Sequence, residues 1–113
     1  MDVLVIEDNL MWSPRIKQTL NGLGHNPIVF AKIPDPLPRA DVAILNLGSK
    51  TLFSAELVEA LKAQGTYVLA HAGHKETELW EMGRAVGCDE IVSNGNLTFR
   101  LGNFLAKVPQ SGD

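Results

Sequence analysis

Five short runs of mostly apolar residues constrain the fold of this chain more than any other feature. Strands that are covered on both faces of a parallel sheet have this almost continuous apolar pattern. Most of the segments between the runs have helical spacing and end in glycine, a common helix stop. The sequence therefore predicts an α/β domain with five parallel strands at residues 3–6, 26–30, 42–45, 67–70 and 90–92.

Helices are predicted to follow four of the five runs. Asn9 or Ser13 can cap the first helix, and Ser54 can cap the second. Asn96 is the predicted cap of the last. The apolar face of the first helix is predicted to hold Leu10, Ile16, Leu20 and Leu23. The later helices are predicted to cover about residues 55–64, 75–86 and 96–106.

Three prolines at alternate positions interrupt the segment between the second and third runs. They are Pro34, Pro36 and Pro38. Proline has no amide hydrogen and moves the preceding residue out of the α region of backbone space. The sequence therefore predicts an extended crossover here in place of a helix, with the right-handed sense that strand twist imposes.

The chain has 113 residues, close to the most common size of one domain. A chain of this length buries enough apolar surface to fold without disulfides or a structural metal. We expect one domain over residues 1–107, followed by a frayed tail at residues 108–113.

Charge and composition exclude several classes of partner. The net charge of -3 comes without any cluster of basic residues, which argues against direct binding of nucleic acid. No apolar stretch approaches the roughly 18 residues of a membrane span. The single cysteine, Cys88, excludes an intramolecular disulfide and is typical of a reducing compartment. We therefore expect a soluble, cytoplasmic protein with no nucleic-acid or membrane partner.

Polar motifs beside the predicted strands carry a resemblance to a known family. The acidic pair Glu7 and Asp8 follows the first strand, Asn46 ends the third, and Gly87-Cys-Asp-Glu90 precedes the last. Across residues 2–107 these motifs resemble the receiver domain of response regulators, the phosphate-accepting module of two-component signalling. The resemblance implies a flavodoxin-like, three-layer α/β/α sandwich with strand order 2-1-3-4-5, from which the second helix has been lost.

The resemblance also implies that the phosphate-accepting chemistry is missing. Asn46 stands where the family has the aspartate that takes the phosphoryl group. An amide carries no negative charge and is a poor nucleophile, so it cannot form the acyl phosphate. Glu7 and Asp8 match the acidic pair that helps to hold magnesium in the family. A weak magnesium site is one interpretation of this pair, and a solvated acidic edge is the other.

Other positions of the family's reactive and switch set are also replaced. His71 stands where the family has a threonine or serine that hydrogen-bonds the phosphoryl group. Ile91 occupies the place of an aromatic residue that turns inward on activation. Asn94 replaces the lysine that pairs with phosphoryl oxygens, which removes a cation that a phosphoryl group needs. The resemblance is therefore to a degenerate receiver, a pseudo-receiver without an ordinary phosphorylation site.

Histidine and cysteine positions allow a zinc interpretation. His71 and His74 have the spacing H-x-x-H and could be joined by Cys88 or His25. The alternatives are that His71 is a hydrogen-bonding residue of the vacated pocket and that Cys88 is a packing residue. Carboxylates beside Cys88 raise the pKa of a thiol, so a reactive cysteine is not expected.

We expect a non-enzymatic signalling protein that binds another signalling protein without phosphorylation. By resemblance, the binding face is formed by the fourth receiver helix, the last strand and the last helix, and this face could also support a homodimer. Trp80 could instead be a core residue. The predicted face includes Trp80, Arg84, Ile91, Phe99 and Arg100.

The alternative function is a small-molecule or ion sensor that uses Asp8, Asn46 and His71.

Overall fold

The structure, a computed structural model, describes residues 1–109, and the rest of the predicted tail, residues 110–113, lies outside the described residues. In chain order the elements are β1 (Asp2–Ile6), α1 (Trp12–Gly22), β2 (Asn26–Phe30), β3 (Val42–Asn46), α2 (Ala55–Ala63), β4 (Tyr67–Ala72), α3 (Thr77–Ala85), β5 (Glu90–Ser93), α4 (Asn94–Phe99) and α5 (Leu101–Leu105). Within residues 1–109, no helix combines the length and the apolarity that crossing a membrane requires.

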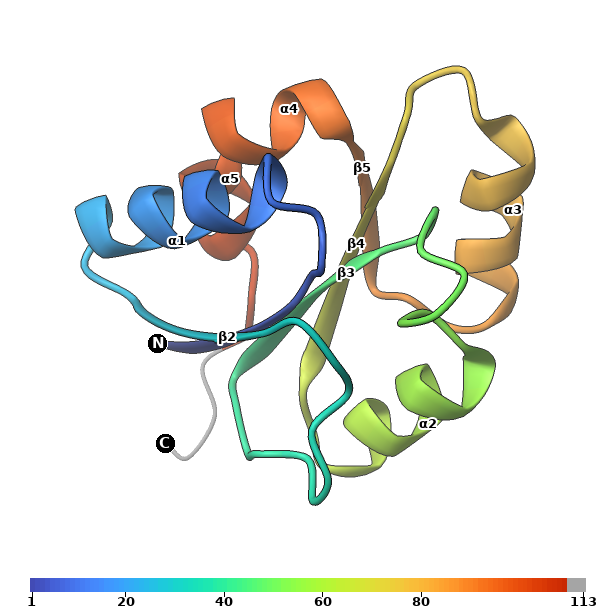
Figure 1. The fold of residues 1–113 in the computed structure, drawn as a ribbon, viewed down its shortest axis with the longest axis horizontal. Coiled ribbons are helices and arrows are strands. Elements are labelled where there is room, and N and C mark those ends of the chain that lie inside the picture. Colours follow the sequence, from blue (N-terminus) through green and yellow to red (C-terminus); the bar gives the residue numbers. More distant parts are fainter. Residues whose placement is uncertain (110–113) are drawn as a thin grey trace.

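The five strands form one parallel sheet with the order β2-β1-β3-β4-β5. Helices α1, α4 and α5 cover one face, and α2 and α3 cover the other (Figure 1). Alternate residues of each strand point to opposite faces, so Val3 and Val5 pack beneath α1 while Leu4 and Ile6 pack on the side of α2. The predicted three-layer sandwich and its strand order are therefore confirmed.

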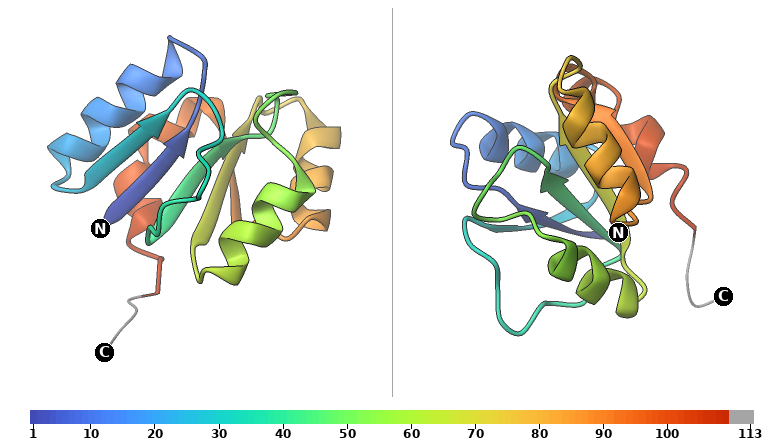
Figure 2. Two further views of the ribbon diagram at one scale, coloured as in Figure 1. Left: turned by 60° about the horizontal axis from the view of Figure 1, so that its bottom comes forward. Right: turned by 90° about the vertical axis from the view of Figure 1, so that its right-hand side faces the viewer.

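The crossover between β2 and β3 contains no helix in residues 31–41, as the prolines predict (Figure 2). It stays attached to the body of the domain because Pro34 is buried and Leu37 packs against the core beneath α2. Gln64 of α2 donates a hydrogen bond from Nε2 to the carbonyl oxygen of Leu37, at 3.3 Å. Without a covering helix, Ile28 and Phe30 of β2 are only partly buried.

The apolar face predicted for the first helix is wrong at both ends. Ile16 and Leu20 are fully buried, but Leu10 is 85% exposed and Leu23 is 45% exposed. Leu10 precedes the first helical residue and Leu23 follows the last, so neither has a helical position above the sheet. Asn9 acts in the turn before the helix, where its Oδ1 accepts a hydrogen bond from the amide of Met11 at 2.8 Å.

The predicted cap of the last helix is also wrong. Ser93 is the cap, because its Oγ accepts a hydrogen bond from the amide of Asn96 at 3.2 Å, and the helix begins at Asn94. The helix then breaks at Arg100 into α4 and α5. The buried part of the chain extends to Val108, the first residue of the predicted tail, which is 5% exposed and packs in the core.

On the other face, α2 has the predicted cap and stop. The Oγ of Ser54 accepts a hydrogen bond from the amide of Leu57 at 3.1 Å. Gly65 follows the helix with a φ of 83°, a left-handed conformation that favours glycine. Helix α3 is shorter than predicted, because residues 75 and 76 lie in the preceding turn.

Candidate functional site

The carboxyl ends of four strands bring the predicted site residues together at one edge of the sheet. Asn46 and His71 are register partners at the ends of β3 and β4. Glu7 comes directly after β1, and Asn94 comes directly after β5. Open α/β sheets bind their ligands at this edge. Four of the sequence-predicted positions therefore meet where the resemblance to receivers places the reactive site.

His71 lies at the centre of this group and has no exposed surface. Its Nε2 lies 3.1 Å from Oε1 of Glu7, and its Nδ1 lies 2.7 Å from Oδ1 of Asn94. The ring of Trp12, from α1, approaches the imidazole edge-on with 6.2 Å between ring centroids. The His71 side chain is thus enclosed by three elements and has a partner for each ring nitrogen.

Glu7 is also buried, with 2% of its surface exposed. Its Oε2 accepts hydrogen bonds from Nδ2 of Asn46 and from the amide of Asn9, both at 3.3 Å. Burial by itself raises the pKa of Glu7. The hydrogen bonds from His71 and Asn46, the charge on His71 and the Asn9 amide together hold the pKa below its ordinary value.

Asn46 connects this group to the loop after β3. Its Oδ1 accepts a hydrogen bond from the amide of Gly48 at 2.9 Å, while its Nδ2 donates to Glu7. A backbone amide can only donate, so this contact fixes which end of the Asn46 side chain is the oxygen. A continuous polar chain therefore runs from Asn94 through His71, Glu7 and Asn46 to Gly48.

The acidic pair does not form a magnesium site in this arrangement. The carboxylate of Glu7 is directed into the polar chain, whereas Asp8 is exposed and accepts a hydrogen bond from the hydroxyl of Thr51 at 3.5 Å. Within the described residues, no three His, Cys, Asp or Glu side chains form a group that could hold a metal ion. The two carboxylates are bonded to different groups, whereas a magnesium ion held by both would require them to be directed at one position.

The zinc interpretation finds no support either. His71 is buried in the polar chain, whereas His74 is exposed on the loop after β4. His25 lies at the opposite end of the strands, where its Nδ1 is 3.0 Å from the amino-terminal nitrogen. Burial and the charge of Asp89 raise the pKa of the Cys88 thiol to about 11, as expected of a packing residue.

The predicted partner face contains a groove with a volume of about 630 Å³. Trp80 of α3, Ile91 of β5 and Arg100 line it together with Arg84. The indole Nε1 of Trp80 donates to the carbonyl oxygen of Gly73 at 3.0 Å, and the Arg84 guanidinium lies 6.0 Å from the centre of the indole ring. Phe99 is 89% exposed but does not line the groove, so the structure brings together four of the five predicted face residues.

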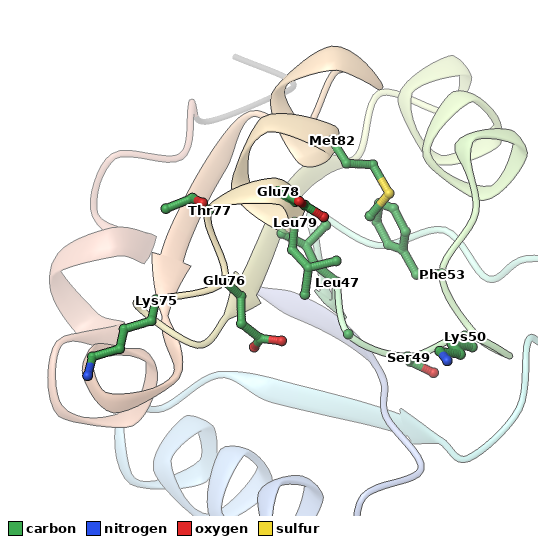
Figure 3. A pocket seen from close by; sticks show the side chains of 11 residues that line it. Leu47, Ser49, Lys50, Phe53, Lys75, Glu76, Thr77, Glu78, Leu79 and Met82 are labelled. Carbon is green, nitrogen blue, oxygen red and sulfur yellow. The ribbon is translucent and has the colours of Figure 1, made fainter.

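A second pocket, of about 610 Å³, was not predicted from the sequence. It lies between α3 and the loop after β3, where Phe53, Leu79 and Met82 form an apolar lining (Figure 3). Leu79 and Met82 have helical spacing on α3 and are partly buried against the cluster that contains Leu47.

The fold of this chain is shared by proteins of known structure. No family model and no curated protein matches this sequence. The architecture is nevertheless that of response-regulator receiver domains, which several solved structures share with this chain. The resemblance seen in the sequence is therefore confirmed for the fold.

Three solved structures illustrate the likeness. A response regulator receiver protein from Burkholderia phymatum has a TM-score of 0.80 and 16% identity, with 95% of this chain and 93% of that chain covered. The chemotaxis response regulator CheY4 of Vibrio cholerae has a TM-score of 0.79 and 21% identity, with 96% and 98% covered. The receiver domain of a sensor histidine kinase from Pseudomonas aeruginosa, solved with magnesium in its active-site cleft, has a TM-score of 0.80 and 16% identity, with 95% of each chain covered.

Proposed function

We propose that this chain is an atypical receiver module that acts in signal transduction by binding another protein, without being phosphorylated and without catalysing a reaction. The observation that supports this most is the polar chain. Receiver chemistry needs a free carboxylate nucleophile, whereas the amide of Asn46 is neutral and bonded at both ends. The positions that the resemblance assigns to phosphorylation are used here to bond one another.

The charges at the carboxyl edge of the sheet also argue against phosphorylation. A phosphoryl group carries nearly two negative charges and requires cations around it. Asn94 supplies an amide in place of the lysine, and its Oδ1 is directed at His71. Among residues 1–109, the one basic side chain that contacts Glu7 is His71, which is buried. A phosphoryl group at Asn46 would therefore lack the charge compensation that receivers supply.

The proposed partner surface is the groove between α3, β5 and α5, with Trp80, Arg84, Ile91 and Arg100 in its wall. Tryptophan and arginine contribute strongly to protein interfaces because they bury large areas and make directed contacts. Here Arg84 lies over the indole ring of Trp80, so the two side chains present one apolar and cationic surface. The partner is another signalling protein, and a second copy of this chain is the alternative occupant.

The geometry does not support the alternative function, a small-molecule or ion sensor at the carboxyl edge of the sheet. Of its three residues, Asn46 and His71 are joined through Glu7, but the exposed Asp8 contacts Thr51. A ligand at this edge would have to displace hydrogen bonds that are already made. The cytoplasmic location and the absence of nucleic-acid and membrane partners stay predictions.

Partner binding tests the proposal with surface variants. Once a partner has been identified by affinity capture, the double variant Trp80→Ala, Arg100→Ala is measured against the purified partner by calorimetry. We expect Kd to rise by about 30-fold or more, because loss of even one hot-spot residue costs about 2 kcal/mol or more and each 1.4 kcal/mol is about a factor of ten.

The matched control for this experiment is Lys17→Ala, Gln18→Ala, which changes two exposed residues of α1 on another side of the domain. Its Kd should equal that of the wild type. Equal affinities for the groove variant and the wild type would contradict the proposed surface. Sedimentation of the same variants shows whether the occupant is instead a second copy.

A further inference from the structure

The pocket between α3 and the loop after β3 exposes apolar surface that belongs neither to the polar chain nor to the groove. Its volume of about 610 Å³ lies in the range of small-molecule sites, roughly 300–1,000 Å³. Phe53 comes from the loop, and Leu79 and Met82 come from α3 (Figure 3). All three side chains are only partly buried. A ligand that covered this surface would gain affinity from its apolar part.

Charged residues of opposite sign lie on the two sides of this apolar lining. Glu76 and Glu78 come from the start of α3 and the turn before it, whereas Lys50 comes from the loop after β3. Figure 3 shows both carboxylates directed toward the pocket and Lys75 directed away from it. No ion pair within residues 1–109 joins Lys50 to either carboxylate. The two sides are therefore complementary to a ligand that carries both a cation and an anion.

The carboxylate of Glu76 is fixed in position by the turn before α3. Its Oε1 accepts a hydrogen bond from the amide of Gly73 at 2.9 Å. The side chain also packs closely over this glycine, because a Cβ added at Gly73 would lie 2.7 Å from Oε1. Groups that are already ordered lose less entropy when a ligand binds. Glu76 is thus held ready to bind a cationic group through its other oxygen.

We propose that this pocket binds a small zwitterion with an apolar side chain, such as a free aromatic or branched-chain amino acid. The carboxylates at the start of α3 bind its ammonium group, Lys50 binds its carboxylate, and the apolar lining takes its side chain. Leu79 and Met82 line this pocket, whereas Trp80 and Arg84 of the same helix line the groove. The site is therefore separate from the proposed partner surface and does not depend on the proposed function.

The test is a titration of the full chain with L-phenylalanine, followed in amide NMR spectra. We expect saturable shifts that are largest in residues 47–53 and 75–82. Phenylpropionate lacks the ammonium group and phenethylamine lacks the carboxylate, so each should bind about three- to fivefold more weakly, the value of one exposed ion pair. L-alanine lacks the apolar group and should bind at least roughly tenfold more weakly.

Exposed charge variants assign the two ends of the ligand. In Glu78→Gln the preference for L-phenylalanine over phenylpropionate should shrink, and in Lys50→Gln the preference over phenethylamine should shrink. The control Glu81→Gln, an exposed change on the groove side of α3, should retain both preferences. The proposal is overturned if L-phenylalanine causes no saturable shift, if the largest shifts lie outside the pocket, or if all four compounds bind equally.

Discussion

The carboxyl edge of the sheet and the groove beside it differ in how their polar groups are satisfied. At the edge, Glu7, Asn46, His71 and Asn94 bond one another, and the two ionisable groups among them are buried. In the groove, Arg100 and the exposed Arg84 present cationic groups to the surface beside the indole of Trp80. The polar groups of the edge are bonded to one another, whereas the groove is open to solvent.

This difference follows from how buried and exposed polar groups are satisfied. Buried polar groups are costly unless each finds a partner, so the buried carboxylate of Glu7 needs partners from within the fold. The amide of Asn46 and the imidazole of His71 provide them. Surface residues such as Arg100 have no such requirement, because water solvates them.

The largest effect is expected at His71. The change His71→Ala removes the imidazole that bonds the buried carboxylate of Glu7, and a buried charge that loses its partner costs about 3–5 kcal/mol. Urea denaturation of the two proteins measures this loss in the free energy of unfolding. His74→Ala, an exposed change on the following loop, should alter that energy by less than about 0.5 kcal/mol. Similar small losses in both variants would show that the buried carboxylate of Glu7 does not depend on His71.

A smaller loss of stability is expected for Asn46→Asp, which restores the acidic residue of the receiver pattern. The new carboxylate would replace Nδ2 of Asn46, 3.3 Å from Oε2 of Glu7, by a like charge. We expect a cost of about 2 kcal/mol near neutral pH, because close carboxylates cannot both ionise readily. Asn103→Asp, an exposed change in α5, provides the control. No loss for Asn46→Asp would mean that Glu7 does not bond Asn46 as described.

The pH dependence of stability tests whether Glu7 is paired in the folded chain. The pKa of Glu7 is held below its ordinary value in the fold, so the unfolded chain binds a proton at this site more readily than the folded chain does. The stabilisation is therefore fully present above the ordinary pKa of a glutamate, about 4.3, and is lost as pH falls through the lower, folded pKa. Urea midpoints between pH 3 and pH 6 should fall less steeply in Glu7→Gln than in the wild type. Parallel curves would contradict the pairing.

The smallest effect on stability is expected in the groove. Arg100 is exposed, and no hydrogen bond or ion pair of its side chain is found within residues 1–109. The change Arg100→Ala should therefore lower the free energy of unfolding by less than about 0.5 kcal/mol, measured by urea denaturation. A loss as large as that of His71→Ala would mean that Arg100 stabilises the fold. The groove and the edge would then not differ in how their polar groups are satisfied.

Much of the fold could be predicted because its signals are local. The apolar runs identify the strands to within a residue or two, Ser54 identifies the start of α2, and the three prolines remove a helix. The errors lie where tertiary structure decides. Leu10 is apolar but lies in the loop before α1. Ser93 occupies the cap position that was predicted for Asn96.

The candidate site was predicted as a set of positions but not as a network. The resemblance to receivers places Glu7, Asn46, His71 and Asn94 at one edge, and the structure brings them together. Side-chain direction was not predictable, so the pairing of Glu7 with His71 and the separate exposure of Asp8 appear only in the structure. Two residues of the sequence could have signalled this pair. His71 stands where the family has a threonine or serine, and Glu7 is an acidic residue at the end of the first strand.

The most direct test of the account is an amide NMR spectrum of the wild-type protein, recorded with and without magnesium and beryllofluoride, a phosphoryl mimic. The account predicts an unchanged spectrum, because the polar chain already occupies the edge and Asn46 carries no nucleophile. Shifts concentrated around Asn46, His71 and Asn94 would contradict it, since they would show that the edge still accepts a metal ion and a phosphoryl group.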